Sequence, residues 1–216
     1  MNRASRTRRP YATEQPSEGE TRQQEIRHAE TPARLSAVLI FTLALQVPVA
    51  RPQSATPGEY QLKAAFLFNF AKFIEWPPSS FANPQSTFEI CILGNDPFGT
   101  AMDDLLRGKV VAEHPVVVTR RKGIEDARHC QILFISSSEQ KRLPAILEAL
   151  KGTNTLAIGE TDGFAASGGV IQFTLEEQHV RFIINTDAAG RAGLQISSKL
   201  LALAKVVRDI PGSGKS

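Results

Sequence analysis

Histidine and serine side chains are the first candidates for catalytic or metal-binding chemistry in this chain. None of the histidines has a cysteine, histidine or carboxylate at a spacing typical of a zinc or iron site. His129 is adjacent to Cys130, but neighbouring residues on a strand point to opposite faces, which argues against a nucleophile–base pair. Ser136, Ser137 and Ser138 lack the G-x-S-x-G pattern of a nucleophile elbow and fit better as caps of a following helix. Composition and spacing therefore show no catalytic machinery, and we expect no metal or cofactor. The four histidines are His28, His114, His129 and His179.

Two loops carry polar groups that could line a ligand site. Gly94, Asn95 and Asp96 follow a predicted strand and precede a predicted helix, where many α/β proteins bind anions. Their spacing matches neither G-x-G-x-x-G nor a Walker loop, so the pattern is weak evidence for a nucleotide. Glu160 and Asp162 follow another predicted strand and should lie at the same edge of the sheet. We expect a candidate crevice for a small ligand there, although such carboxylates more often form a solvated turn.

The two cysteines, Cys91 and Cys130, predict one disulfide. They follow an uncharged apolar stretch over residues 35–45 that is typical of a secretory signal, and export would place them in an oxidising compartment. In a parallel sheet of order 2-1-3, a cysteine in the first strand and one at the start of the third could lie side by side. The alternative is two buried free thiols in a cytosolic protein. A redox role is weaker still, because there is no C-x-x-C.

The N-terminal quarter differs in composition from the rest. Residues 1–33 contain almost no large apolar side chains, so we interpret them as a disordered extension or the result of a misassigned start codon. Residues 34–55 are predicted to be a signal peptide, because their apolar run is too short to span a bilayer comfortably. The alternative is a short buried helix. The formal net charge of +3 lies entirely within residues 1–55, so the remaining neutral part gives no argument for nucleic-acid binding.

Predicted strands and helices alternate over residues 56–210. This order favours one α/β domain with three layers, a mainly parallel sheet of Rossmann or flavodoxin type and a C-terminal antiparallel hairpin, followed by a flexible tail over residues 211–216. Asp96 is the expected N-cap of the second helix, with Pro97 at its first position. The expected helices cover residues 59–75, 97–106, 138–150 and 198–207. The expected strands cover 88–93, 116–118, 132–135, 155–158, 170–174 and 179–184, with a short segment at 194–196.

The helix expected over residues 59–75 has little polar surface. Phe66, Phe70, Phe73 and Trp76 are candidates for contacts with a second copy of the chain or with a partner protein. Packing in the core is the stronger interpretation for most of these residues, since a helix with so few polar positions is usually covered on more than one side.

Several strings resemble the YfiR family of periplasmic proteins. The resemblance begins at Tyr60-Gln-Leu-Lys-Ala-Ala-Phe-Leu-Phe-Asn-Phe-Ala-Lys-Phe-Ile-Glu-Trp-Pro77 and covers nearly all of residues 58–208. The first and last strings are fairly specific, and the middle ones are short. The other strings are Cys91-Ile-Leu-Gly94, Asp96-Pro97-Phe98, Leu133-Phe134-Ile135, Gly168-Gly169-Val-Ile171, Phe182-Ile-Ile-Asn185 and Ser197-Ser-Lys-Leu-Leu201 with Leu203-Ala204.

The resemblance implies a regulatory protein in the periplasm, not an enzyme. Proteins similar to YfiR are dimers that bind the periplasmic sensor domain of an inner-membrane diguanylate cyclase and repress cyclic di-GMP synthesis. An outer-membrane lipoprotein can sequester the repressor. Cys91 and Cys130 match the structurally important disulfide of the family, whereas a second disulfide in its best studied member cannot form here. The partner could also be another membrane sensor such as a histidine kinase. The rival classes are a periplasmic small-ligand-binding protein and a periplasmic hydrolase.

Overall fold

The computed structural model describes residues 57–209. The predicted extension over residues 1–33, signal peptide over residues 34–55 and tail over residues 211–216 lie outside the described residues. The limits of the domain expected over residues 56–210 therefore stay a prediction. Within the described range, no helix has the length and apolar character needed to cross a membrane.

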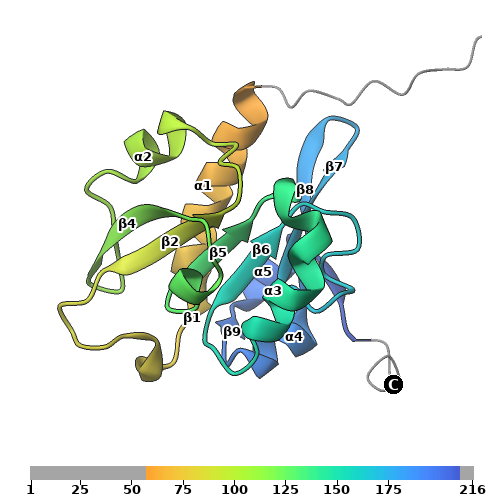
Figure 1. Ribbon diagram of the computed structural model, residues 1–216. Coiled ribbons are helices and arrows are strands. Elements are labelled where there is room, and N and C mark those ends of the chain that lie inside the picture. The colour runs from red at the N-terminus through yellow and green to blue at the C-terminus, as the bar shows by residue number, and fades with distance from the viewer. Residues whose placement is uncertain (1–56, 210–216) are drawn as a thin grey trace, which may run out of the picture. The chain divides into compact units, whose positions relative to one another are not determined.

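A mostly parallel sheet forms the centre of the described part of the chain (Figure 1). Its eight strands follow the order β10-β8-β7-β6-β5-β2-β4-β3. The pairs β7–β8 and β3–β4 are antiparallel, and the other neighbouring pairs are parallel. The α/β class and the mainly parallel sheet expected from the sequence are thus confirmed. The strands are β2 (Phe88–Leu93), β3 (Val110–Val111), β4 (His114–Arg121), β5 (Ile132–Ile135), β6 (Leu156–Gly159), β7 (Ile171–Glu176), β8 (His179–Asn185) and β10 (Lys205–Val207).

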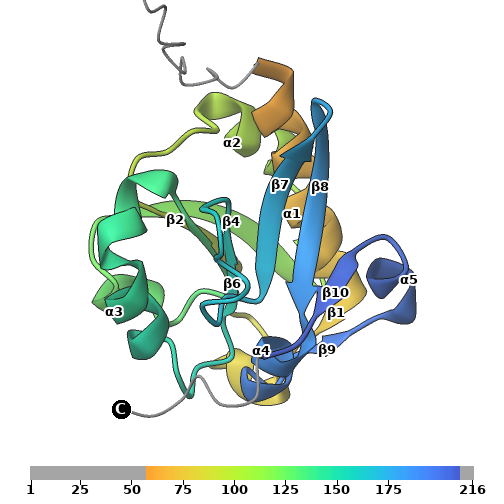
Figure 2. The same ribbon diagram turned by 90° about the vertical axis from the view of Figure 1, so that its right-hand side faces the viewer.

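Helices cover both faces of the central strands, because these strands are apolar on both sides. In β2, Ile90 and Ile92 belong to the core beneath α1, whereas Cys91 and Leu93 belong to the core beneath α3. Figure 2 shows α1 and α3 on opposite sides of the sheet. The helices are α1 (Pro57–Phe73), α2 (Thr100–Leu106), α3 (Leu143–Ala149), α4 (Thr186–Arg191) and α5 (Ser198–Leu201), with 3-10 turns η1 (Pro78–Ser80), η2 (Glu125–Ala127) and η3 (Ser137–Arg142).

Four phenylalanines fix α1 against β7 and β8. Phe66 and Phe70 come from α1, and Phe173 lies opposite Phe182 in the antiparallel pair. The ring centroids of Phe70 and Phe182 are 5.1 Å apart, and those of Phe66 and Phe182 are 5.5 Å apart. Edge-to-face packing at such distances is favourable for aromatic rings. The cluster therefore holds α1 against β7 and β8.

The predicted disulfide joins Cys91 in β2 to Cys130 just before β5, with 6.0 Å between their Cα atoms. The two cysteines meet because β2 lies between β4 and β5, which is the 2-1-3 order expected from the sequence. The bond lies in the core beneath α3, where Cys91 is fully buried. It therefore ties the start of β5 to the middle of the sheet.

The helix predicted over residues 198–207 is wrong. The chain makes only the short helix α5, whose N-cap Ser197 accepts a hydrogen bond from the Leu200 amide, and then continues as β10. β10 pairs in parallel with β8, so Val206 lies opposite Ile184. Residues 205–207 form a strand instead of a helix because the edge of β8 offers them backbone hydrogen-bond partners, and because Val206 and Val207 are β-branched.

The predicted N-cap role of Asp96 is also wrong. One carboxylate oxygen of Asp96 accepts hydrogen bonds from the amides of Phe98 and Gly99, which closes a turn before the helix. α2 begins only at Thr100, after Gly99 with a φ of 56°. The other carboxylate oxygen of Asp96 pairs with Arg120.

Other boundaries shift by smaller amounts. The first helix ends at Phe73, because Ile74–Glu75 form a short strand β1 that pairs with Gln195–Ile196, the strand β9. The helix expected over residues 138–150 starts as the 3-10 turn η3, and its cap is Ser136. The short strand β3 and the helix α4 were not predicted.

Candidate functional site

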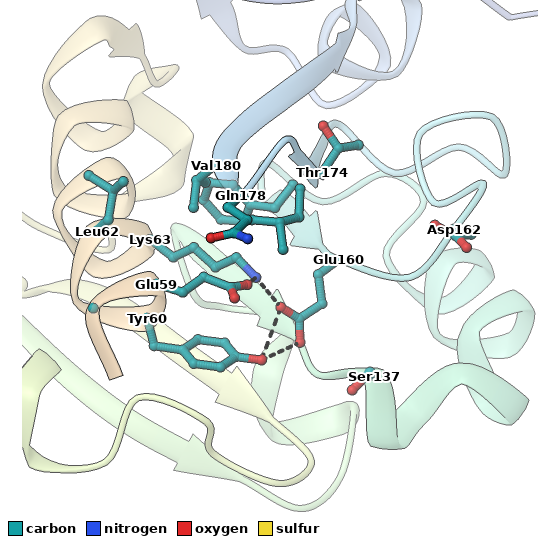
Figure 3. Close-up of a pocket in the computed structure, with 13 residues that line it drawn as sticks. Glu59, Tyr60, Leu62, Lys63, Ser137, Glu160, Asp162, Thr174, Gln178 and Val180 are labelled. Atoms are coloured by element: carbon teal, nitrogen blue, oxygen red, sulfur yellow. Dashed lines mark hydrogen bonds and ion pairs between the residues drawn. The ribbon is translucent and has the colours of Figure 1, made fainter. Parts of the chain in front are cut away.

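A pocket of about 780 Å³ opens beside the first turns of α1, between the loop after β6 and the strands β7 and β8 (Figure 3). The carboxyl ends of strands are where open α/β sheets usually bind ligands. Two of the residues expected in a ligand crevice, Glu160 and Asp162, line this pocket. The full lining is Gly58, Glu59, Tyr60, Leu62, Lys63, Ser137, Glu160, Asp162, Phe173, Thr174, Leu175, Gln178 and Val180.

A buried lysine lies at the centre of the polar side of the pocket. The Lys63 ammonium is 2.6 Å from a carboxylate oxygen of Glu59 and 2.7 Å from one of Glu160. Glu59 and Lys63 are four residues apart on α1, the spacing that brings two side chains together on a helix. The Lys63 side chain is only 5% exposed. A charge this buried needs a partner, which both carboxylates supply.

Tyr60 completes the polar cluster. Its hydroxyl donates to the Glu160 carboxylate at 3.2 Å, and its ring packs edge-on against Phe98 at 5.5 Å. Burial, together with the negative charge of Glu160, raises the pKa of Tyr60 well above its usual value. The hydroxyl therefore stays protonated at physiological pH and remains a donor to Glu160.

The cluster offers binding groups, with no nucleophile activated by a neighbouring base. The Lys63 ammonium is paired with two carboxylates, and the raised pKa of Tyr60 keeps its hydroxyl protonated. Ser137 lines the pocket without a histidine among the lining residues. Such an arrangement can position a charged or polar group of a ligand.

The other half of the predicted crevice lies elsewhere. Gly94, Asn95 and Asp96 do not line the pocket, although they follow β2 at the same end of the sheet. The Asn95 amide donates to the Ser138 hydroxyl, which closes the loop against η3. The single crevice expected from the sequence is therefore divided, with Glu160 and Asp162 at the pocket and Asp96 in a separate ion-pair cluster.

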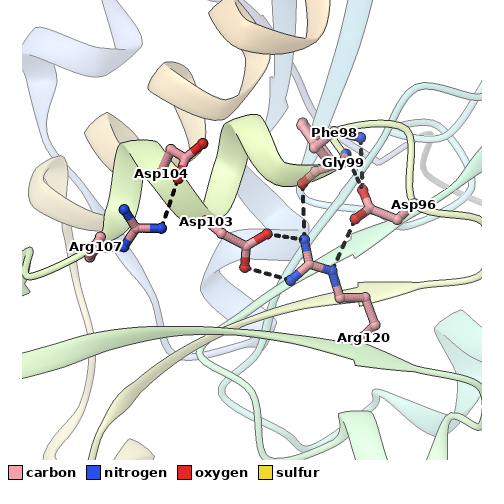
Figure 4. Close-up of polar contacts among 7 residues, drawn as sticks. All are labelled: Asp96, Phe98, Gly99, Asp103, Asp104, Arg107 and Arg120. Carbon is pink, nitrogen blue, oxygen red and sulfur yellow. Dashed lines mark hydrogen bonds and ion pairs between the residues drawn. The ribbon is translucent and has the colours of Figure 1, made fainter.

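That ion-pair cluster is centred on Arg120 of β4 (Figure 4). The guanidinium group makes two hydrogen bonds of 2.6 Å to Asp103 of α2 and one of 3.0 Å to Asp96. A further bond of 3.1 Å reaches the carbonyl oxygen of Gly99. The hydrogen bonds from Arg120 lower the pKa of Asp103. Because its donors are used by these partners, Arg120 holds the loop and α2 onto β4.

The four aromatic residues predicted as a dimer or partner surface differ in exposure. Phe70 is fully buried, in agreement with the core interpretation, and Phe66 is half-buried. Trp76 is half-buried, with its indole N–H donating to the carbonyl oxygen of Gln131. Phe73 is 40% exposed. The exposed row on α1 also includes Leu62, which is 46% exposed.

A second pocket, of about 750 Å³, lies near the amino ends of β2, β5 and β6 and includes His129 and Cys130 in its lining. The Cys91 and Cys130 sulfurs come within 4.8 Å of a carboxylate oxygen of Glu89. Thiolate is the form of cysteine that binds metal, and both sulfurs are used in the disulfide. This group therefore does not fit a metal site in its oxidised form.

Three residues at the centre of the first pocket, Glu59, Tyr60 and Lys63, are not among the site residues expected from the sequence. They belong to the helix whose apolar pattern predicts packing in the core. The available signal was the four-residue spacing of Glu59 and Lys63 in a helix with few other charges. Their partner, Glu160, lies 97 residues after Lys63, and only the fold brings it there.

The structure is that of an α/β protein with one disulfide and a pocket whose charged and polar side chains could bind a ligand. The family model described as YfiR/HmsC-like matches residues 60–205, so the chain belongs to this family. The match confirms the resemblance read from the sequence. Proteins of this family are periplasmic regulators.

Two solved structures show a weaker likeness. One is a conserved domain protein from Vibrio cholerae, with 11% identity, a TM-score of 0.48 and coverage of 70% of this chain and 60% of that one. The other is the ABC domain from Streptococcus pneumoniae in complex with L-Trp, with 10% identity, a TM-score of 0.44 and the same coverage. The chain thus spans 60% of the length of each structure. No curated protein sequence matches it significantly.

Proposed function

We propose that the protein is a periplasmic regulator that binds the periplasmic sensor domain of an inner-membrane diguanylate cyclase and represses cyclic di-GMP synthesis. The family match over residues 60–205 is the observation that carries this proposal. The active unit would be a homodimer, and an outer-membrane lipoprotein would relieve repression by sequestering it. The disulfide is consistent with a protein that works in an oxidising compartment.

Repression of this kind requires only binding energy. A protein that binds the inactive conformation of a sensor more tightly than the active one shifts the equilibrium by the ratio of the two affinities. The shift is therefore limited by that differential affinity, and no chemical step by the repressor is needed. A rigid regulator loses little entropy on binding, and a sheet packed on both faces and closed by a disulfide provides that rigidity.

The exposed row on α1, formed by Leu62, Phe66 and Phe73, is the proposed contact surface for the sensor domain. Leu62 is 46% and Phe73 40% exposed, whereas Phe66 is half-buried against Phe182. Their spacing places the three residues on one face of the helix, and exposed large apolar side chains are typical anchors of a protein interface. The buried Phe70 would act only by holding the helix in place.

An affinity capture from detergent-solubilised membranes tests the proposal, with the purified protein as bait under non-reducing conditions. We expect recovery of a membrane diguanylate cyclase. The variant Phe73→Ser should recover much less cyclase, whereas Val110→Ser should recover the wild-type amount. Val110 is a matched control because it is an exposed apolar residue, 56% exposed, at the β3 edge of the sheet. Equal recovery by both variants would remove the α1 row from the interface.

Two outcomes would change the proposed function. Recovery of a different membrane sensor, such as a histidine kinase, would keep the regulatory role and replace the cyclase. Failure of well-folded bait to recover any sensor would favour the second candidate, a periplasmic small-ligand-binding protein. The pocket beside Lys63 is the observation that supports this second candidate.

A further inference from the structure

We propose that the pocket beside Lys63 binds an organic cation, namely a protonated amine attached to a small apolar body. The proposal rests on the charges of the pocket, on its apolar wall and on its size. It does not depend on which membrane protein the regulator contacts, and of the exposed row on α1 it uses only Leu62, which also lines the pocket.

The charge of the lining favours a cation. Glu59, Glu160 and Asp162 contribute three carboxylates, and Lys63 contributes one ammonium group, so the formal charge of the lining is negative. The Lys63 ammonium is within 2.7 Å of Glu59 and Glu160 and is thereby already paired. An anionic ligand would have to break these pairs, whereas a cationic ligand can approach the carboxylates of the lining without removing Lys63 from them.

Two of these carboxylates, Glu59 and Glu160, are held in place before any ligand arrives. The side chains of Glu59 and Glu160 are 11% and 12% exposed, and Tyr60 donates a hydrogen bond to Glu160. Figure 3 shows Glu59, Tyr60 and Lys63 projecting from α1 toward Glu160. Fixed, poorly solvated carboxylates attract an ammonium group more strongly than mobile surface carboxylates do.

The opposite side of the pocket is apolar. Phe173, Leu175 and Val180 line it from β7 and β8, and Leu62 lines it from α1. Leu62 is 46% exposed and Leu175 44% exposed, although both are large apolar side chains. Removing these apolar side chains from water is favourable. The ligand should therefore have an apolar part next to its charged group. The volume of about 780 Å³ is in the range of pockets that bind small molecules.

The proposal is tested on the purified protein with three compounds that each contain a phenyl ring. They are 2-phenylethylamine, the neutral 2-phenylethanol and the anionic 3-phenylpropanoate. Calorimetry measures their affinity, and thermal unfolding measures their effect on the melting temperature. We expect the amine to bind, to raise the melting temperature with concentration, and to bind at least about tenfold more tightly than the other two, as expected for a charge-assisted contact. No binding of the amine at millimolar concentration, or equal binding of the alcohol, would overturn the proposal.

Variants locate the site. Glu160→Gln should weaken amine binding by roughly tenfold or more, because it removes a charged acceptor. Leu175→Ala should also weaken binding, and it should leave the fold intact because this side chain is partly exposed on the rim. Asp103→Asn, in the Arg120 cluster, should bind like the wild type. Wild-type affinity in both pocket variants would show that the amine binds elsewhere and would contradict the proposal.

Discussion

Lys63 on α1 and Glu160 after β6 form a buried ion pair with 2.7 Å between the ammonium nitrogen and a carboxylate oxygen, although they are 97 residues apart in the chain. The pair joins the first helix to the carboxyl end of the sheet. It therefore contributes both to the fold and to the pocket that the two residues line.

Removing Lys63 should destabilise the protein strongly. The variant Lys63→Met leaves Glu59 and Glu160 as neighbouring buried carboxylates without a counter-charge, and breaking a buried pair in this way costs about 3 kcal/mol. Urea unfolding followed by circular dichroism measures the loss. Lys72→Met is the control, because Lys72 is exposed on the same helix, and its effect should be below about 0.5 kcal/mol. A similar loss of unfolding free energy in both variants would show that the ion pair contributes no more to stability than an exposed lysine does.

The disulfide should contribute substantially to stability. The bond joins residues with a sequence separation of 39, and the loop-entropy model gives about 3 to 4 kcal/mol for a loop of this length. The double variant Cys91→Ala/Cys130→Ala should lose this amount in urea unfolding. Reduction of the wild type should produce a similar loss and should leave the variant unaffected. An unchanged midpoint in the variant would contradict the expectation.

A methyl group at Gly169 should be poorly tolerated. A Cβ atom there would overlap the ring of Phe164, which is fully buried and also contacts Gly159. We expect Gly169→Ala to lower the free energy of unfolding by about 1 to 3 kcal/mol, the usual cost of overpacking. Gly190→Ala is the matched control in α4, where a Cβ meets no atom, and it should stabilise the protein by about 0.5 to 1 kcal/mol. Thermal unfolding of both variants provides the comparison.

The Arg120–Asp103 pair should stabilise the protein in a pH-dependent way. Its hydrogen bonds lower the pKa of Asp103 in the folded state, so the contribution is complete above the unfolded pKa of about 3.9 and disappears as the pH falls through the lower folded value. Because Asp103 is partly exposed, we expect Asp103→Asn to cost less than about 1 kcal/mol near neutral pH. The difference from the wild type should shrink below about pH 4. A difference that grows on acidification would contradict this assignment.

Local patterns predicted the inner strands well. The apolar runs at residues 88–93 and 132–135 match β2 and β5, because parallel strands buried on both faces are apolar at every position. The disulfide followed from the order of these strands. The C-terminal helix was wrong because Val206 pairs with β8, and the local pattern carries no information on an open strand edge elsewhere in the sheet.

The candidate site was predicted only in part. Glu160 and Asp162 do line a pocket, because residues after parallel strands gather at one end of the sheet. Asp96 lies at the same end of the sheet but is bound to Arg120. Glu59, Tyr60 and Lys63 reach the pocket because α1 packs on β7 and β8. The spacing of Glu59 and Lys63 indicates that these two side chains meet on one face of the helix. It gives no information on Glu160, which only the packing of the helix brings to them.

The most direct test of the proposed regulatory role is the rate of cyclic di-GMP synthesis by membranes that contain the captured cyclase, measured as the purified protein is added. We predict that the rate falls with concentration to a plateau, and that Phe73→Ser requires a much higher concentration than Val110→Ser for the same effect. A rate that is unchanged by saturating, correctly folded and disulfide-bonded protein would contradict repression through the sensor domain.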